Sequence, residues 1–195
     1  MNKRMQCFGL YFVLCLSACA VTRQARGDQI SLFDGDTLAG WRLVGAAEWR
    51  VINGAIEAAG DKDGYLVTEK TFADYRLTLE FWIEATTNSG VFIGCPTQVL
   101  FSPEVCYEIN IWDEHPRPSA RTGSIVLEVM PPLAYVETVG KWNTYEITSM
   151  GSTLVVELNG IVTAELDNTR AEAGYIALQH AGTGRIRFRN LRLSH

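Results

Sequence analysis

Apolar and polar residues alternate with a period of two through most of the chain. The clearest case is residues 75–83, where Tyr75, Leu77, Leu79, Phe81 and Ile83 alternate with polar residues and one indole. Successive side chains of a β-strand point to opposite faces, so this pattern predicts a strand with one face in a core. Comparable segments occupy residues 91–95, 107–113, 145–149, 153–158, 175–179 and 186–193. No stretch of ten residues keeps a helical period.

Turn-forming residues separate these segments. They are Asn88-Ser-Gly90, Met150-Gly-Ser152, Asn159-Gly160 and Gly182-Thr-Gly184. Asn-Gly between two alternating runs is the strongest short signal for a hairpin. Many short strands joined in this way predict an all-β fold, a two-sheet antiparallel sandwich or jelly roll.

The polar face of residues 107–113 carries several side chains that could bind a ligand. Tyr107, Ile109 and Ile111 share one face, whereas the other face carries Glu108, Asn110 and Trp112 and leads into Asp113. An indole can stack on the C–H face of a sugar ring while a carboxylate and an amide bind its hydroxyls. The alternative is an ordinary sandwich strand whose polar face has no ligand.

The first residues are typical of a bacterial lipoprotein signal. Lys3 and Arg4 precede an apolar run that is too short to span a bilayer and that ends in Leu16-Ser-Ala-Cys19. We expect residues 1–18 to be a signal peptide, Cys19 to carry the lipid and residues 19–29 to be a tether. Residues 30–195 would then form a single domain. The alternative is a secretory signal in which the cysteine is coincidental.

Composition and charge limit the classes of molecule that this protein can bind. The 17 basic residues, or 15 without Lys3 and Arg4, face 22 acidic ones. Such a balance argues against nucleic acid, which needs a basic surface to neutralise phosphates. We expect a protein of the bacterial cell envelope, anchored by its lipid in the outer membrane and facing the periplasm. Its ligand would be a neutral carbohydrate.

Two cysteines, Cys95 and Cys106, lie in the body of the chain. In an oxidising periplasm they could form a disulfide that closes the loop between them, and the alternative is a pair of buried thiols. No CxxC or histidine-rich spacing indicates zinc.

Several separated motifs resemble one known family in the same order. They include residues 32–41 (LFDGDTLAGW), 49–54 (WRVING), 88–90 (NSG), 107–113, 122–125 (TGSI), 141–146 (KWNTYE), 158–160 (LNG), 176–179 (IALQ) and 188–190 (FRN). Together they are similar to the 3-keto-disaccharide hydrolase domain, and the resemblance extends from Ile30 to Leu193. It implies a concanavalin-like jelly roll and a glycoside or keto-glycoside substrate.

The chemistry implied by this resemblance is elimination. A ketone at C3 of a sugar acidifies the C2 proton, so a modest base can remove that proton and expel the glycosidic oxygen. Addition of water then gives net hydrolysis. Such a site needs a base, an acid for the leaving oxygen, and a polar group or metal that stabilises the enolate. The activity expected is hydrolysis or elimination of 3-keto-glycosides, and the alternative is a carbohydrate-binding lipoprotein without catalysis.

Four residues are candidates for catalysis. Glu80 and Glu108 each lie on a strand face opposite an apolar face, and we expect both to open onto one sheet, as base or as ligands of a divalent cation such as Ca²⁺. His115 and His180 are acid–base candidates, because histidine titrates near neutral pH. His115 precedes Pro116 and has a structural alternative, whereas His180 follows an LQ pair after which relatives often carry a histidine.

Six further residues are candidates for sugar binding. They are Asn88, Asn110, Trp82, Trp112, Asp113 and Gln179. Asn88 has an alternative role in turn formation, and both tryptophans have one in packing. Relatives commonly carry an arginine directly after the residues NSGVFI, where this chain has Gly94. This departure shifts the expected substrate or removes the activity, unless Arg76 or Arg121 substitutes.

Overall fold

A computed structural model describes residues 29–127, 135–167, 169 and 172–195. The expected signal peptide, Cys19 and nearly all of the tether lie outside these residues. Within the described part of the chain, no helix is long and apolar enough to cross a membrane.

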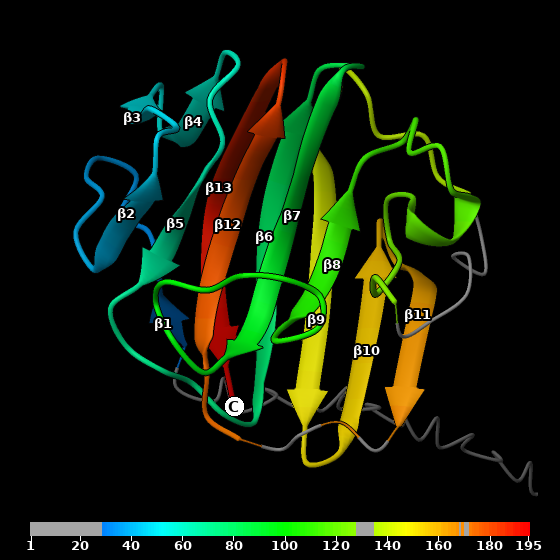
Figure 1. The fold of residues 1–195 in the computed structure, drawn as a ribbon. Helices are drawn as coiled ribbons and strands as arrows, with labels where there is room; N and C mark the ends of the chain where they lie inside the picture. The colour runs from blue at the N-terminus through cyan, green and yellow to red at the C-terminus, as the bar shows by residue number, and fades with distance from the viewer. Residues whose placement is uncertain (1–28, 128–134, 168, 170–171) are drawn as a thin grey trace, which may run out of the picture.

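Two antiparallel sheets form a sandwich (Figure 1). The larger one, sheet A, has the strand order β11-β10-β9-β6-β13-β4-β3, with β1 beside β13. Its strands are β1 (Ile30–Ser31), β3 (Trp49–Ile52), β4 (Ala55–Ala59), β6 (Tyr75–Ile83), β9 (Asn143–Met150), β10 (Thr153–Leu158), β11 (Ile161–Asp167) and β13 (Arg185–Ser194). The fold class predicted from the sequence is confirmed.

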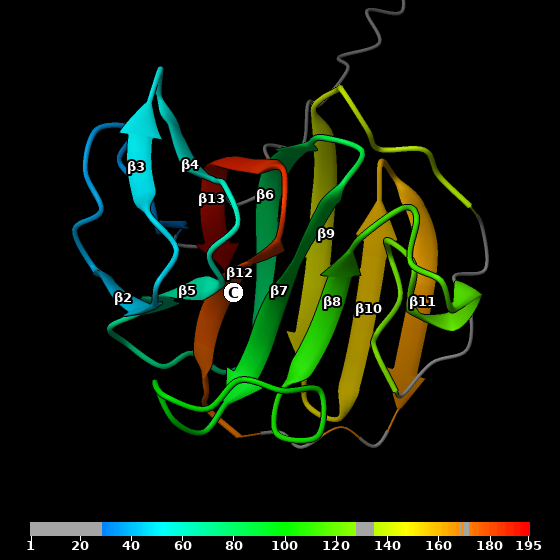
Figure 2. The same cartoon turned by 45° about the horizontal axis from the view of Figure 1, so that its top comes forward.

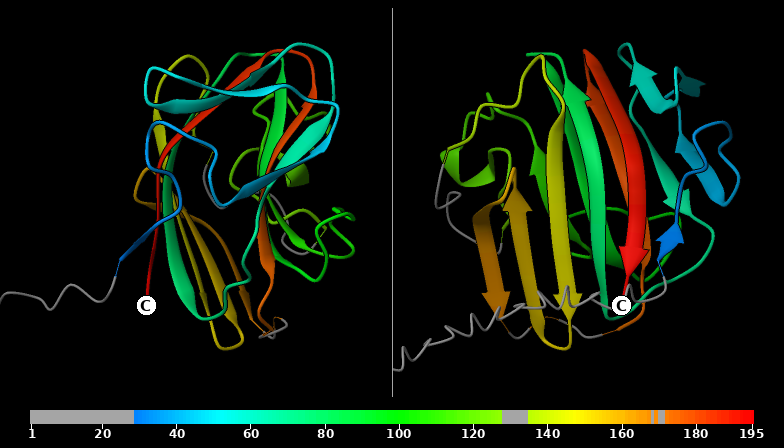
Figure 3. Two further views of the ribbon diagram at one scale, coloured as in Figure 1. Left: turned by 90° about the vertical axis from the view of Figure 1, so that its left-hand side faces the viewer. Right: turned by 180° about the vertical axis from the view of Figure 1, so that it is seen from behind.

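Sheet B faces the viewer in Figure 1 and has the strand order β2-β5-β12-β7-β8. Its strands are β2 (Trp41–Gly45), β5 (Gly64–Thr68), β7 (Thr87–Cys95), β8 (Tyr107–Ile111) and β12 (Tyr175–Gly182). The views in Figures 2 and 3 show the two layers and the loops that join them.

The core lies between the sheets and is made of the alternating apolar residues. On β6 the core residues are those predicted, Tyr75 to Ile83 in steps of two, and on β8 the core residues are Tyr107, Ile109 and Ile111. Because side chains alternate, Glu108 and Asn110 are left on the outer face of sheet B. The strand β8 ends at Ile111, so Trp112 and Asp113 belong to the loop that follows.

The predicted turn at Asn88-Ser-Gly90 is wrong, because these residues lie inside β7. The strand continues through them because it has a partner on each side, with Gly90 opposite Asn110 of β8 and Gln179 of β12. The Ser89 hydroxyl donates to the Gln179 carbonyl at 2.6 Å. The other three predicted turns are confirmed: each connects two consecutive strands.

The Cys95–Cys106 disulfide, one of the two possibilities for these cysteines, is formed. It closes residues 96–105 into a loop that crosses the outer face of sheet B (Figure 1). Below the loop is a second, smaller apolar cluster that includes Val67, Phe92 and Ala177. One part of this outer face is therefore apolar and covered, and the other part carries polar side chains.

Asp113 ties together the loops beside β8. Its carboxylate is buried and accepts hydrogen bonds from the Thr122 hydroxyl at 2.5 Å, and from the Thr138 amide and hydroxyl, both at 2.7 Å. Thr138 lies 25 residues further along the chain. These partners give Asp113 a structural function in addition to any contact with a ligand.

Replacement of Asp113 by Ala should therefore destabilise the fold. The change leaves Thr122 and Thr138 without their acceptor, and we expect the free energy of unfolding to fall by about 3 kcal/mol. Urea denaturation followed by circular dichroism measures this. Glu114→Ala, a change at the exposed neighbour, is the control and should shift stability by no more than about 0.5 kcal/mol. Equal effects of the two changes would contradict this structural function.

Candidate functional site

Residues from four adjacent strands meet on the outer face of sheet B. Glu108 comes from β8, Gly90 from β7, Gln179 from β12 and Tyr65 from β5. The strand register places Gly90 opposite Gln179, and Gln179 opposite Tyr65. These four residues are called the Glu108 cluster below.

Gly90 allows Glu108 and Gln179 to come close together, because it has no side chain of its own. A Cβ atom added there would lie 3.4 Å from Cγ of Glu108 and 3.4 Å from Oε1 of Gln179. Glu108 and Gln179 therefore flank the same point of the sheet from two different strands. A residue with a side chain at this position would fill the space between them.

Glu108 is a buried carboxyl group without a partner. Only 8% of the residue is exposed, and its side chain has no hydrogen bond or ion pair within the described part of the chain. Burial raises its pKa to about 7, and the negative charge of Glu104 adds to the effect. A carboxyl group with this pKa can accept or donate a proton near neutral pH.

Gln179 also has unused hydrogen-bonding capacity. Its Nε2 donates to the Tyr65 hydroxyl at 3.4 Å, whereas its Oε1 is buried without a partner. Burial raises the pKa of Tyr65, so the hydroxyl stays protonated at neutral pH. Buried polar atoms are almost always satisfied in folded proteins, which makes the free Oε1 a candidate ligand-binding atom.

Asn88 extends the cluster along β7. It lies on the same face as Gly90, is half-buried and pairs in register with Ala181. No hydrogen bond engages its side chain among the residues that the structure describes. The turn-forming alternative for Asn88 is excluded, since the residue lies within a strand.

Asn110 shares the outer face with Glu108, but its side-chain amide is already engaged. The amide donates to the carbonyl of Ala120. The main-chain carbonyl of Asn110 accepts a hydrogen bond from the buried Tyr145 hydroxyl at 2.6 Å, and this bond connects sheet A to sheet B. Asn110 thus has contacts that hold the strand and the neighbouring loop.

Trp112 and His115 lie together in the loop after β8. Their rings meet edge to face with centroids 4.4 Å apart, and the Arg117 amide donates to Nδ1 of His115 at 3.0 Å. Both residues are half-buried. They form a small structural unit at the end of the strand.

His180 points away from the Glu108 cluster. It follows Gln179 in the strand and therefore faces the interior, where it is fully buried. Its Nδ1 lies 2.9 Å from the Lys62 carbonyl and its Nε2 lies 3.2 Å from the Gly184 carbonyl. The structure brings Gln179, and not His180, to the outer face of sheet B.

Glu80 and Trp82 lie on the outer face of sheet A, so the expectation that Glu80 and Glu108 share one sheet is wrong. Arg189 contacts the Glu80 carboxylate at 2.6 Å, and the Asn190 amide donates to it at 2.7 Å. Burial opposes ionisation of Glu80, but the hydrogen bonds from Asn190 and Arg189 and the charge of Arg189 outweigh it and lower its pKa. Trp82 packs under the Arg187 guanidinium, 5.0 Å from the ring centroid. The two glutamates cannot jointly bind one cation.

Gly94 occupies an irregular part of β7. Its φ of +64° is rarely adopted by residues with side chains, and a Cβ on Gly174 would lie 2.5 Å from its Cα. An arginine here would have to adopt the same left-handed backbone, although its Cβ would make only ordinary contacts with Tyr107, at 3.6 and 3.9 Å. Arg76 pairs with Glu146 on sheet A, and Arg121 packs over Tyr135 and donates to the His115 carbonyl. Neither arginine contacts the Glu108 cluster.

Tyr65 is the cluster residue that sequence reasoning missed. Its segment, Gly64 to Thr68, is a short continuous run of aromatic and β-branched or aliphatic residues, which is consistent with a strand but shows no alternation. The pairing of β5 with β12 brings the tyrosine to Gln179, and that pairing is not visible in the sequence.

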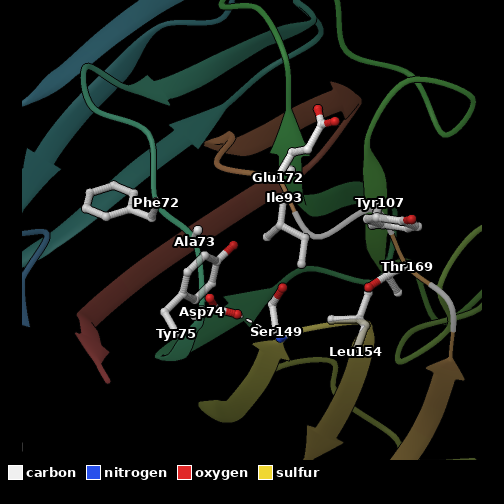
Figure 4. A pocket seen from close by; sticks show the side chains of 12 residues that line it. Phe72, Ala73, Asp74, Tyr75, Ile93, Tyr107, Ser149, Leu154, Thr169 and Glu172 are labelled. Carbon is white, nitrogen blue, oxygen red and sulfur yellow. Dashed lines mark hydrogen bonds between the residues drawn. The ribbon is translucent and has the colours of Figure 1, made fainter.

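Two cavities lie elsewhere. A narrow one opens between the sheets and is lined by residues that include Tyr75, Ile93, Tyr107 and Leu154 (Figure 4). Its volume of about 10 Å³ holds about one water molecule, so it is too small for a sugar. A second, mainly apolar cavity of about 220 Å³ lies beside Ile30, Trp41 and Phe72. In the described residues, no group of three or more His, Cys, Asp or Glu side chains is arranged to hold a metal ion.

Comparison with solved structures finds the same fold in other proteins. A protein from Parabacteroides distasonis with the provisional name glycosyl hydrolase matches with a TM-score of 0.72 and 24% identity, over 85% of this chain and 98% of that one. A second protein of that name from the same organism matches with a TM-score of 0.72 and 18% identity, over 85% and 93%. The carbohydrate-binding module CBM66 from Bacillus subtilis matches with a TM-score of 0.60 and 14% identity, over 80% and 96%.

No curated protein matches the chain. The model of one protein family does match, over residues 28–194, and its description is 3-keto-alpha-glucoside-1,2-lyase-like domain. This range contains both sheets and every residue of the Glu108 cluster. The chain therefore belongs to the family of 3-keto-alpha-glucoside-1,2-lyase-like domains, which is the family that its sequence motifs resemble.

Proposed function

We propose that this protein binds 3-keto-glycosides on the outer face of sheet B and cleaves their glycosidic bond by elimination. The observation that carries the proposal is the Glu108 cluster, in which an unpaired carboxyl group with a pKa of about 7 faces a free amide oxygen across Gly90. Membership of the family supports a carbohydrate-related function.

In this mechanism Glu108 is the base. Its carboxylate takes the proton from C2 of the keto sugar, which the neighbouring ketone acidifies. The electron pair of the C2–H bond forms a C1=C2 double bond, and the C1–O bond breaks. The leaving oxygen takes a proton from the Tyr65 hydroxyl or from water. Water can then add to the unsaturated sugar to complete hydrolysis.

The other residues of the site bind and orient the sugar. Oε1 of Gln179 accepts a hydrogen bond from a hydroxyl, which gives this buried atom its missing partner. The Asn88 amide, free of protein partners among the described residues, binds a second oxygen. Because Gly90 has no side chain, Glu108 and Gln179 lie close enough together to contact the same sugar ring from the outer face of the sheet.

A binding protein without catalysis is the second candidate. Tyr65 and Phe101 present stacked rings, 4.5 Å apart, beside the polar groups, and rings of this kind bind the apolar faces of sugars. The structural likeness to CBM66, a carbohydrate-binding module, favours this candidate. Glu108 would then hydrogen-bond a sugar without accepting its proton.

Replacement of Glu108 by Gln should abolish turnover of a chromogenic 3-keto-glucoside and leave binding largely intact, because glutamine keeps the shape of the side chain but cannot act as a base. We expect kcat to fall by about 10²–10⁴-fold, the range typical of a lost general base. Steady-state kinetics with and without a chelator measure the effect, and Glu165→Gln, an exposed change on β11, is the control.

The same substrate also distinguishes an enzyme from a binding protein, when binding and turnover are measured side by side. Gly90→Val should abolish both, since its side chain fills the space between Glu108 and Gln179. Wild-type protein that binds the sugar but turns none over, with or without divalent metal, would support the binding protein and refute the enzyme.

The raised pKa of Glu108 also predicts a pH dependence of stability. Its carboxyl group has a pKa near 4.5 when unfolded and about 7 when folded, so between these values the unfolded chain releases a proton that the folded chain keeps. The contribution of this group to the free energy of unfolding is fully present below pH 4.5 and is lost as the pH rises to about 7. The loss is about 3 kcal/mol at most. Urea denaturation of wild type and Glu108→Gln should give curves that diverge across this range, and parallel curves would contradict the assignment.

We further propose that the protein is a lipoprotein of the bacterial cell envelope, anchored through Cys19 in the outer membrane. The disulfide supports an oxidising compartment, where such bonds persist. Cys19→Ala should prevent incorporation of labelled palmitate and shift the protein from the membrane fraction to the soluble fraction. Unchanged labelling of the variant would contradict the anchor.

A further inference from the structure

The loop of residues 96–105 is fastened to sheet B at several points. The disulfide joins its two ends. Along the loop, Nε2 of Gln98 donates to the Thr68 carbonyl at 2.9 Å, and Nη1 of Arg42 donates to Oε1 of Gln98 at 3.4 Å. These contacts involve β5 and the edge strand β2, so the loop spans the outer face of sheet B.

Phe101 connects the loop to the Glu108 cluster. Its ring packs on the Tyr65 ring at 4.5 Å, and edge to face with Phe92 at 6.4 Å. Tyr65 in turn accepts the hydrogen bond from Gln179, whose Oε1 is the free buried atom of the site. A continuous chain of contacts therefore runs from the loop to this oxygen.

Glu104 connects the same loop to Glu108. The side-chain hydrogen bond from Ser102 lowers the pKa of Glu104, which keeps it negatively charged at neutral pH. That charge acts on Glu108 and favours its protonated form. Glu104 is exposed, so its influence on Glu108 is electrostatic and is not a packing contact.

We propose that the disulfide-closed loop is the positioning element of the sugar site and that it orients Gln179 through Phe101 and Tyr65. This inference rests on the proposed function of the Glu108 cluster and adds the residues that control it. Phe101 is the positioning residue, because it acts through Tyr65, and the charge of Glu104 is an accompanying influence of the same loop.

Reduction of the disulfide is expected to release this control. A dithiol supplies two electrons and two protons, becomes a cyclic disulfide itself and leaves two cysteine thiols at Cys95 and Cys106. The ten residues between them then gain conformational freedom, which is what the closed loop removes. Phe101 then no longer fixes Tyr65.

Single variants that keep the disulfide test the two connections separately. Phe101→Ala should raise KM for the 3-keto-glucoside by about tenfold and leave the pH profile unchanged. Phe101→Tyr, which keeps the aromatic ring, should have the KM of the wild type. Glu104→Gln should shift the acidic limb of the pH profile to lower pH with an unchanged KM. Val99→Ala, at a loop residue that is 68% exposed, and Glu114→Gln are the controls.

A readout that needs no turnover completes the design. The carboxyl carbon signal of Glu108 in NMR should titrate at lower pH in Glu104→Gln than in wild type. The double variant Cys95→Ser/Cys106→Ser, and wild type treated with dithiothreitol, should combine the rise in KM with the shift in pH. Circular dichroism establishes that each variant is folded.

The outcomes distinguish the two proposals. If wild type is active and the folded Phe101→Ala and Glu104→Gln variants match it in KM, pH profile and NMR titration, the loop does not position the site and this inference is refuted. If wild type neither binds nor cleaves the sugar, the proposed function is refuted and the inference with it.

Discussion

Burial of Ile109 and Ile111 between the two sheets is the interaction on which the site depends. These residues are fully buried, and their burial fixes which face of β8 meets the core. A shift of one residue in the register would bring Glu108 into the core and expose the isoleucines, at a large cost in free energy. Pairing of β8 with β7 and of β7 with β12 then extends this constraint to Gly90 and Gln179. The core thereby determines the arrangement of polar groups on the opposite side of the sheet.

The Glu108 cluster departs from the rule that buried polar groups are paired, and among the described residues Nε1 of Trp49, Oγ of Ser124 and Nε of Arg185 also have no hydrogen-bond partner. Elsewhere the buried carboxylate of Asp113 has three hydrogen bonds, and Glu80 is paired with Arg189 and Asn190. Glu108 and Oε1 of Gln179 have no such partners, although burial of either without one is unfavourable. The surrounding core and the disulfide-closed loop offset this cost. Departures of this kind are characteristic of functional sites.

The alternation of residues predicted strands at seven segments from residue 75 onward and the direction of most of their side chains, because this period follows from the geometry of a single strand. The short strands before residue 75 were largely missed. The alternation correctly placed Glu108 opposite a buried face. The arrangement of strands into sheets depends on contacts between distant segments, which one sequence does not display. For that reason the two glutamates were expected on one sheet and lie on two, and Tyr65 was missed. Asp113 was chosen as a candidate for sugar binding because it is polar. Its structural function was not predicted, because its partner Thr138 lies 25 residues away in the chain. The Asn88-Ser-Gly90 turn failed because two neighbouring strands override the local preference.

The contact between Gly94 and Gly174 constrains how this chain can change. The two backbones approach so closely that a Cβ on Gly174 would lie within 2.8 Å of three atoms of residues 94 and 95. Gly94 also has a φ that other residues rarely adopt. A single substitution at Gly174 therefore meets a steric barrier. At Gly94 a Cβ would make only ordinary contacts with Tyr107, at 3.6 and 3.9 Å, so the cost there is that of the left-handed backbone alone. Position 174 is thus closed to side chains by the pairing of the strands, whereas position 94 can still acquire one at a conformational cost.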